Sequence, residues 1–243
     1  MHPISKRRKL GQHNLVDLVS ISKIVSAAKI SKSESVLEVG AGRGGLTARL
    51  CEDSGRVISY ELDTLLAMKA RASLDKFTNL EVRTGDPFRS EAADFDVFVS
   101  NLPYSRSRDA IEWLARRTFK RAVVTVQQEF ADKLCAKPGT KSFRAISAVA
   151  AFCFKIDWLF KIEPTSFSPP PKVSSTVLKL SQIDSLDSTT IKWVKFLFGF
   201  RNRLASAVAR RMAVEFPTDK RIFELSPSEL VQLARLILDV RSI

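Results

Sequence analysis

Short apolar runs alternate with longer amphipathic stretches over the first 180 residues of this 243-residue chain. The short runs predict β-strands, and the stretches between them predict α-helices. The predicted strands span residues 35–39, 56–60, 80–83, 94–100 and 122–126, and the predicted helices span residues 16–28, 46–52, 64–73, 108–118 and 128–135. Regular alternation of strand and helix predicts an α/β fold with a parallel sheet that helices cover on both faces.

The pattern changes after residue 150. Residues 151–162 and 174–180 read as two more strands, and the loop between them holds four of the ten prolines. Because proline fixes φ and lacks an N–H donor, this loop is neither helix nor central strand. A hairpin here would place an antiparallel strand at or near the sheet edge.

The last sixty residues read as helices after a polar stretch. We expect them at residues 190–200, 203–214 and 227–238. Ser226 precedes the last helix and Glu229 follows three positions later, which is the signature of a capping box. We therefore predict two domains, residues 1–183 and residues 184–243.

The composition indicates a polyanionic partner, because the net charge is +13. Nucleic acid is the simplest such partner. No apolar run approaches the ~20 residues that a membrane span needs, so we expect no membrane association. The three cysteines show no CxxC spacing. We therefore expect neither a zinc site nor a disulfide framework, no metal, and a cytoplasmic location.

A glycine-rich turn follows the first predicted strand. Gly40, Gly42 and Gly45 satisfy the GxGxxG fingerprint of dinucleotide sites, and Glu61 follows the next strand about 20 positions later. A carboxylate there can bind both hydroxyls of a ribose. NAD and S-adenosylmethionine both contain that ribose, so these two motifs do not separate an oxidoreductase from a methyltransferase.

Two later motifs favour the methyltransferase. Asp86, after the third strand, can accept a hydrogen bond from the amino group of a cofactor's adenine. The run Asn101-Leu102-Pro103-Tyr104 follows the fourth strand with an amide, backbone carbonyls and a ring. These groups suit an extruded adenine whose N6 is to be methylated, with Tyr104 stacking on the base. Phe167 is a candidate for the second face, although a core phenylalanine is an equal alternative.

In combination these motifs resemble the KsgA-type ribosomal RNA adenine dimethyltransferases. The resemblance covers essentially the whole chain, including residues 10–17, 126–134 and 198–203. It implies a Rossmann-like class I methyltransferase sheet, a small all-helical C-terminal domain that contacts rRNA, and S-adenosylmethionine as cofactor. The implied reaction is dimethylation at N6 of two adjacent adenines, in a hairpin near the 3′ end of small-subunit rRNA, during ribosome assembly.

The resemblance and the motifs together predict the site residues. The predicted catalytic residues are Asn101, Leu102, Pro103, Tyr104 and Phe167. The predicted cofactor-binding residues are Gln12, His13, Leu15, Gly40, Gly42, Glu61, Leu62, Asp86, Pro87 and Asn101. The predicted partners are small-subunit rRNA and the pre-ribosomal small subunit, and we expect a monomer.

The chain departs from the family pattern at two positions near the site. Asn14 stands where the family usually has an aromatic residue. Arg106 stands where a hydrophobic residue commonly follows the tetrapeptide, and its charge could meet a phosphate. Two alternatives stay open within the resemblance: an antibiotic-resistance enzyme that acts on large-subunit rRNA, and a non-catalytic assembly factor.

Overall fold

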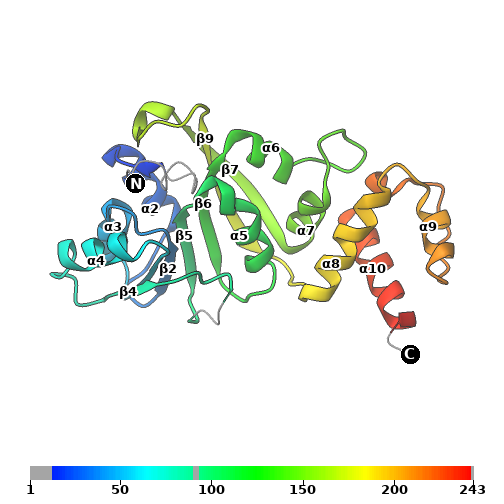
Figure 1. Cartoon of the computed structure of the whole chain (residues 1–243), viewed down its shortest axis with the longest axis horizontal. Helices are drawn as coiled ribbons and strands as arrows, with labels where there is room; N and C mark the ends of the chain where they lie inside the picture. The colour runs from blue at the N-terminus through cyan, green and yellow to red at the C-terminus, as the bar shows by residue number, and fades with distance from the viewer. Residues whose placement is uncertain (1–12, 90–92, 242–243) are drawn as a thin grey trace. The chain divides into compact units, whose positions relative to one another are not determined.

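The computed structural model describes residues 13–89 and 93–241, which fall into two compact units (Figure 1). The first unit takes in the described residues up to Ala110 together with Phe119–Gln128 and Ile156–Ser181. The second takes in Ile111–Thr118, Glu129–Lys155 and the described residues from Gln182 onward. The domain boundary predicted after residue 183 lies near the start of the last of these segments and otherwise stays a prediction.

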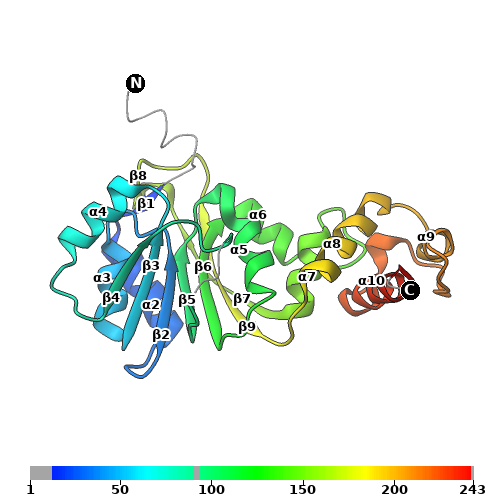
Figure 2. The same cartoon turned by 60° about the horizontal axis from the view of Figure 1, so that its bottom comes forward.

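The first unit is built on a seven-stranded sheet with the order β4-β3-β2-β5-β6-β9-β7 (Figure 2). Strands β2 to β6 are parallel to their neighbours, and β9 pairs antiparallel with β6. This arrangement confirms both the parallel sheet and the antiparallel strand near its edge. The bounds are β2 Ser35–Val39, β3 Arg56–Glu61, β4 Leu80–Thr84, β5 Val97–Asn101, β6 Arg121–Gln127, β7 Phe154–Ile162 and β9 Ser175–Gln182.

The central strands are buried on both faces. Val36, Val57 and Val97 belong to a core cluster with the inward residues of α2 (Leu18–Ala28) and α3 (Gly45–Asp53). Their neighbours in sequence point to the opposite face and are equally buried, as Leu37, Ile58 and Phe98 are each 0% exposed. Burial on both faces is what makes these strands read as continuous apolar runs.

Aspartate side chains cap the N-termini of three helices in the described chain, and two of these helices belong to the first unit. Asp17 accepts hydrogen bonds from the N–H groups of Val19 and Ser20 at the start of α2. Asp63 does the same for α4, Thr64–Ser73. Such caps satisfy backbone donors that have no partner inside the helix, which is why the chain turns from strand to helix at these points.

The strand predicted at residues 151–162 is partly wrong. Helix α7 occupies Ala145–Cys153, and β7 begins only at Phe154. The misassigned residues follow an alanine-rich run, and a short continuous apolar run does not show by periodicity whether it is helix or strand. The structure also contains a short antiparallel pair, β1 (Asn14–Leu15) and β8 (Phe167–Ser168), that was not predicted from the sequence.

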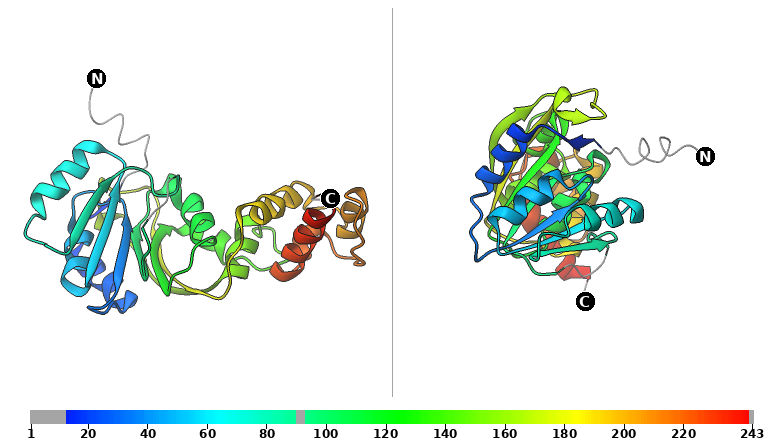
Figure 3. Two further views of the ribbon diagram at one scale, coloured as in Figure 1. Left: turned by 90° about the horizontal axis from the view of Figure 1, so that it is seen from below. Right: turned by 90° about the vertical axis from the view of Figure 1, so that its left-hand side faces the viewer.

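The second unit contains the predicted C-terminal helices. Helices α8 (Ser188–Leu197) and α10 (Pro227–Arg241) lie side by side (Figure 2 and Figure 3). The predicted capping box is confirmed, because Glu229 accepts from the Ser226 N–H and Ser226 Oγ accepts from the Glu229 N–H. The other helices are α5 Ser107–Leu114, shared with the first unit, α6 Gln128–Leu134 and α9 Ala205–Arg211. Within residues 13–89 and 93–241, no helix combines the length and the apolarity of a membrane span.

Candidate active site

The predicted site residues gather where the parallel strands end. Gly40 follows β2, Glu61 ends β3, Asp86 follows β4 and Asn101 ends β5. The strand order therefore places Asp86, Glu61, Gly40 and Asn101 one after another along the carboxyl edge. The direction of strand addition reverses between β2 and β5, and ligands of open α/β sheets bind at such a switch point.

The glycine turn needs its glycines for backbone conformation. Gly40 and Gly42 have φ of 90° and 54°, in the left-handed region that favours glycine. The Gly40 N–H donates to Tyr60 O at 2.7 Å, and the buried Ser100 hydroxyl donates to Val39 O at 2.7 Å. The turn is thus held from β3 on one side and from β5 on the other.

Glu61 holds the turn from inside. Its side chain is 2% exposed, with Oε2 accepting from the Gly42 N–H at 2.9 Å and Oε1 accepting from the Asp63 N–H at 3.0 Å. Each oxygen of a carboxylate has two lone pairs, so the group can also accept from the hydroxyls of a ribose. Both β3 and the glycine turn therefore depend on this one carboxylate.

A second buried carboxyl lies behind the turn. Glu38 Oε2 accepts from the hydroxyls of Thr47 and Ser59, each at 2.6 Å, and the residue is 1% exposed. Burial raises the pKa of Glu38 to about 7, against the opposing effect of those two hydroxyls and with a smaller contribution from the charge of Glu61. Glu38 ties β2, β3 and α3 together beneath the turn.

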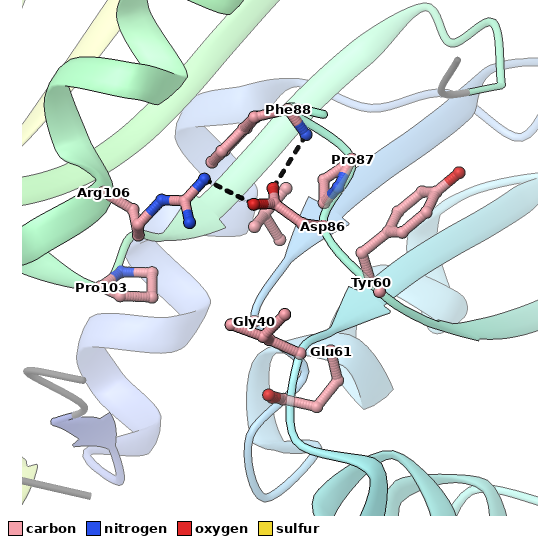
Figure 4. A pocket seen from close by; sticks show the side chains of 11 residues that line it. Gly40, Tyr60, Glu61, Asp86, Pro87, Phe88, Pro103 and Arg106 are labelled. Atoms are coloured by element: carbon pink, nitrogen blue, oxygen red, sulfur yellow. Dashed lines mark hydrogen bonds and ion pairs between the residues drawn. The ribbon is translucent and has the colours of Figure 1, made fainter. Parts of the chain in front are cut away.

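A pocket opens in front of these strand ends (Figure 4). Gly40 and Glu61 lie on one side, and Asp86 with its neighbours lies across from them. Leu62, 49% exposed, adds apolar surface. The lining residues are Val39, Gly40, Tyr60, Glu61, Leu62, Gly85, Asp86, Pro87, Phe88, Pro103 and Arg106. Acidic acceptors, a close backbone turn and apolar walls fit the ribose and adenine of S-adenosylmethionine.

The carboxylate of Asp86 is held by two donors at the pocket wall. Oδ1 accepts from the Phe88 N–H at 3.0 Å, and Oδ2 accepts from Arg106 Nη2 at 2.8 Å. Figure 4 shows the Arg106 side chain turned toward Asp86. Arg106 also pairs with Asp109, Nε to Oδ2 at 2.9 Å. In this conformation its charge is balanced by carboxylates, which differs from the phosphate contact considered from the sequence.

The amide of Asn101 is oriented by a backbone group. Its Nδ2 donates to His13 O at 2.9 Å, so Oδ1 is the end available to accept from a target base. The next residue, Leu102, is 1% exposed, and its N–H donates to Thr125 O of β6. The tetrapeptide is thus anchored to the sheet on one side and to the strand β1 region on the other.

Tyr104 is fixed at its hydroxyl and beside its ring. The hydroxyl shares a hydrogen bond of 2.6 Å with Ser175 Oγ, and the ring centroid lies 5.2 Å from that of His13. Burial raises the pKa of the Tyr104 hydroxyl, so the phenol stays neutral near pH 7. The His13 ring donates through Nδ1 to Pro169 O at 2.8 Å.

The structure brings only some of the predicted residues to the pocket. Its lining includes Gly40, Glu61, Leu62, Asp86, Pro87 and Pro103, but not His13, Leu15, Gly42, Asn101, Leu102, Tyr104 or Phe167. Phe167 is 3% exposed and Leu15 is 8% exposed, and both belong to the hydrophobic core cluster. In this conformation the Phe167 ring offers no face to a base, and its stacking role stays a prediction. Gln12 lies outside the described residues.

Five residues that line the pocket were not in the predicted set: Val39, Tyr60, Gly85, Phe88 and Arg106. Ser175, which binds Tyr104, was not predicted either. Arg106 showed a signal in the sequence, because it departs from the family pattern. Tyr60 and Phe88 directly adjoin predicted motifs, and nothing in the sequence connects Ser175 with Tyr104.

The sheet order, the glycine turn and the acids at successive strand ends define a class I methyltransferase fold. The comparisons agree and give the family. The sequence model of the family described as "Ribosomal RNA adenine dimethylase" matches residues 4–219. The chain belongs to this family. The predictions of the family, of the fold class and of an enzyme that uses S-adenosylmethionine to transfer methyl groups are thereby confirmed.

Related proteins and solved structures match most of the chain. It is 32% identical to the "Probable ribosomal RNA small subunit methyltransferase A" of Methanosarcina mazei, over 95% of this chain and 93% of that protein. A solved dimethyladenosine transferase from Plasmodium falciparum is 26% identical with a TM-score of 0.78, over 95% of this chain and 98% of that one. The 23S rRNA methyltransferase ErmE shares the fold, with 23% identity, a TM-score of 0.66, and 92% and 98% coverage.

Proposed function

We propose that this protein transfers methyl groups from S-adenosylmethionine to N6 of two adjacent adenines, in a hairpin near the 3′ end of small-subunit rRNA. The observation that carries the proposal is the oriented amide of Asn101, whose Nδ2 is committed to His13 O. Its Oδ1 and a neighbouring backbone carbonyl form a pair of acceptors for an exocyclic amino group.

This pair of acceptors addresses the difficulty of the reaction. The N6 lone pair of adenine is delocalised into the ring, and two hydrogen bonds from N6–H favour a more pyramidal nitrogen. S-adenosylmethionine supplies a methyl group already activated on a sulfonium. The protein therefore contributes orientation and electrostatic placement. Methyl transfer breaks the bond between the sulfur and the methyl carbon, forms the N6–CH3 bond, and releases S-adenosylhomocysteine and one proton from N6.

The second unit offers a basic surface for the RNA. A groove there is lined by Asn202, Arg203, Leu204, Ala207, Val208, Arg211 and Arg221. Three arginines along one groove suit successive phosphates, which give affinity and register without reading sequence. We include contact between this C-terminal region and rRNA, and a monomer acting on an assembling small subunit, in the proposal.

The test is methylation of defined ribosomal particles. Purified protein is incubated with labelled S-adenosylmethionine and with small or large subunits that lack the modification, and the rRNA nucleosides are identified by mass spectrometry. We expect dimethyladenosine at two adjacent positions in the small subunit and none with Asn101→Ala. Methylation confined to the large subunit would show that the protein acts on large-subunit rRNA, as the antibiotic-resistance enzymes do. Binding of small subunits without methylation would leave only an assembly factor.

A further inference from the structure

Arg106 brings a positive charge into the wall of the cofactor pocket. It lies two positions after Tyr104, at the end of the short helix Tyr104–Arg106 that follows the tetrapeptide. Its side chain is 24% exposed, and that of its partner Asp86 is 15% exposed. A charged pair with so little contact with solvent is held more firmly than a surface pair, because solvent screens it less.

The guanidinium is fixed by three contacts at once. Nη2 binds Asp86 Oδ2 at 2.8 Å, Nε lies 2.9 Å from Asp109 Oδ2, and Cζ lies 5.2 Å from the centroid of the Phe88 ring. Because the donors of a guanidinium form a rigid planar fork, these partners together determine its position. A lysine here would supply the charge without that geometry.

The effect of this arrangement falls on the Asp86 carboxylate. Phe88 N–H holds Oδ1 and Arg106 holds Oδ2, so rotation of the carboxylate would break a contact at either oxygen. A carboxylate accepts about four hydrogen bonds, so it can receive a ligand's amino group beside these protein donors. An acceptor that is already oriented loses less entropy when the ligand binds.

We propose that Arg106 is a positioning residue that orients Asp86 toward the amino group of the cofactor's adenine and so determines how well the pocket distinguishes adenine from other bases. The inference rests on the proposed function, because it takes S-adenosylmethionine as the ligand of this pocket. Arg106 acts through Asp86 and does not itself touch the reacting atoms.

Arg89 provides a matched control on the same carboxylate. Its Nε lies 3.6 Å from Asp86 Oδ2, but its side chain is 83% exposed. An exposed arginine at that distance contributes little orientation. Arg89→Leu and Arg106→Leu therefore each remove one positive charge beside Asp86, and only the second removes the fixed contact.

The experiment measures dissociation constants by calorimetry for two ligands, S-adenosylhomocysteine and S-inosylhomocysteine. The second ligand has a carbonyl oxygen where adenine has its amino group, so it has no exocyclic donor for Asp86 at that position. We expect Arg106→Leu to weaken S-adenosylhomocysteine binding about tenfold, the order expected when one hydrogen bond to a charged group is loosened. S-inosylhomocysteine binding should change much less, so the preference for adenine falls. Arg89→Leu should keep the wild-type preference, and Arg106→Lys should be intermediate.

A double substitution shows whether Arg106 works through Asp86. Asp86→Asn with Arg106→Leu should lose no more adenine preference than Asp86→Asn alone, because residues that act as one unit are not additive. The preference is a ratio within one preparation, so partial misfolding does not imitate the result. An unchanged ratio in Arg106→Leu, or additive losses, would overturn the inference. Failure of the wild-type protein to bind S-adenosylhomocysteine would instead overturn the proposed function.

Discussion

Replacing Glu61 by glutamine tests the carboxylate that joins the glycine turn to β3. The two side chains have the same shape, but an amide has one oxygen acceptor and an NH₂ group in place of the other. In the structure both oxygens of Glu61 are used, one by the Gly42 N–H at 2.9 Å and one by the Asp63 N–H at 3.0 Å. Glu61→Gln therefore places an amide donor against one of these two backbone donors.

The magnitude follows from that geometry. A hydrogen bond to a charged group contributes about 1.5–3 kcal/mol, and Glu61→Gln keeps one neutral hydrogen bond, so we expect the free energy of unfolding to fall by about 2 kcal/mol. The cofactor's ribose loses a charged acceptor as well. We expect the affinity for S-adenosylhomocysteine to fall about 10–100-fold, since each 1.4 kcal/mol is about tenfold in the dissociation constant.

Calorimetric titration and urea denaturation measure these two quantities. Glu52→Gln is the control, because Glu52 is also an acid of the same region but its side chain is 47% exposed in a surface pair with Arg49. That pair contributes little, so both quantities should stay near the wild-type values. A dissociation constant within about twofold of wild type for Glu61→Gln would refute the assigned ribose contact. Unchanged stability would refute the role in holding the turn.

Three further outcomes follow from the structure. The hydrogen bond from Arg121 lowers the pKa of Glu34 from 4.5 to about 2, so the stability that this carboxylate contributes is complete above pH 4.5 and is lost as the pH falls toward 2. In denaturation curves, Glu34→Gln should lower the free energy of unfolding by about 2 kcal/mol at pH 7 and reduce the loss of stability in acid. An unchanged loss of stability in acid would contradict this reasoning. Tyr104→Phe keeps the ring and loses only the Ser175 contact, so methylation rates should fall far less than in Tyr104→Ala; equal losses would argue against stacking. The logarithm of rRNA affinity should fall linearly with the logarithm of salt concentration in filter-binding assays, and an affinity that does not change with salt would refute the proposed phosphate contacts.

Much of the sheet and of the cofactor side could be predicted because the information is local. A buried strand followed by glycines or an acid is visible within about ten residues, and parallel strands bring their carboxyl ends to one edge. Gly40, Glu61 and Asp86 accordingly line one pocket. The prediction of a strand from residue 151 failed because the apolar run that ends at Cys153 has no periodic pattern that separates helix from strand.

The contacts that could not be predicted join residues far apart in the chain. β1 pairs with β8 across more than 150 residues, and this pairing accompanies the burial of Phe167 in the core. Arg106 contacts Asp86 across 20 residues of sequence, and β3 and β2 lie between β4 and β5 in the sheet. In each case the sequence shows the residue types but not the partner, since side-chain pairing depends on how elements pack.

The site depends on His13 as well as on the tetrapeptide Asn101-Leu102-Pro103-Tyr104. Its backbone oxygen accepts from Asn101 Nδ2, its ring lies beside Tyr104, and its Nδ1 donates to Pro169 O. The strand β1 region, the tetrapeptide and the proline-rich loop are therefore connected through one residue. Without that carbonyl, the Asn101 amide could rotate and present a donor where a target amino group needs an acceptor. The chemistry at N6 depends on this orientation, because a displaced acceptor loses most of the benefit of proximity.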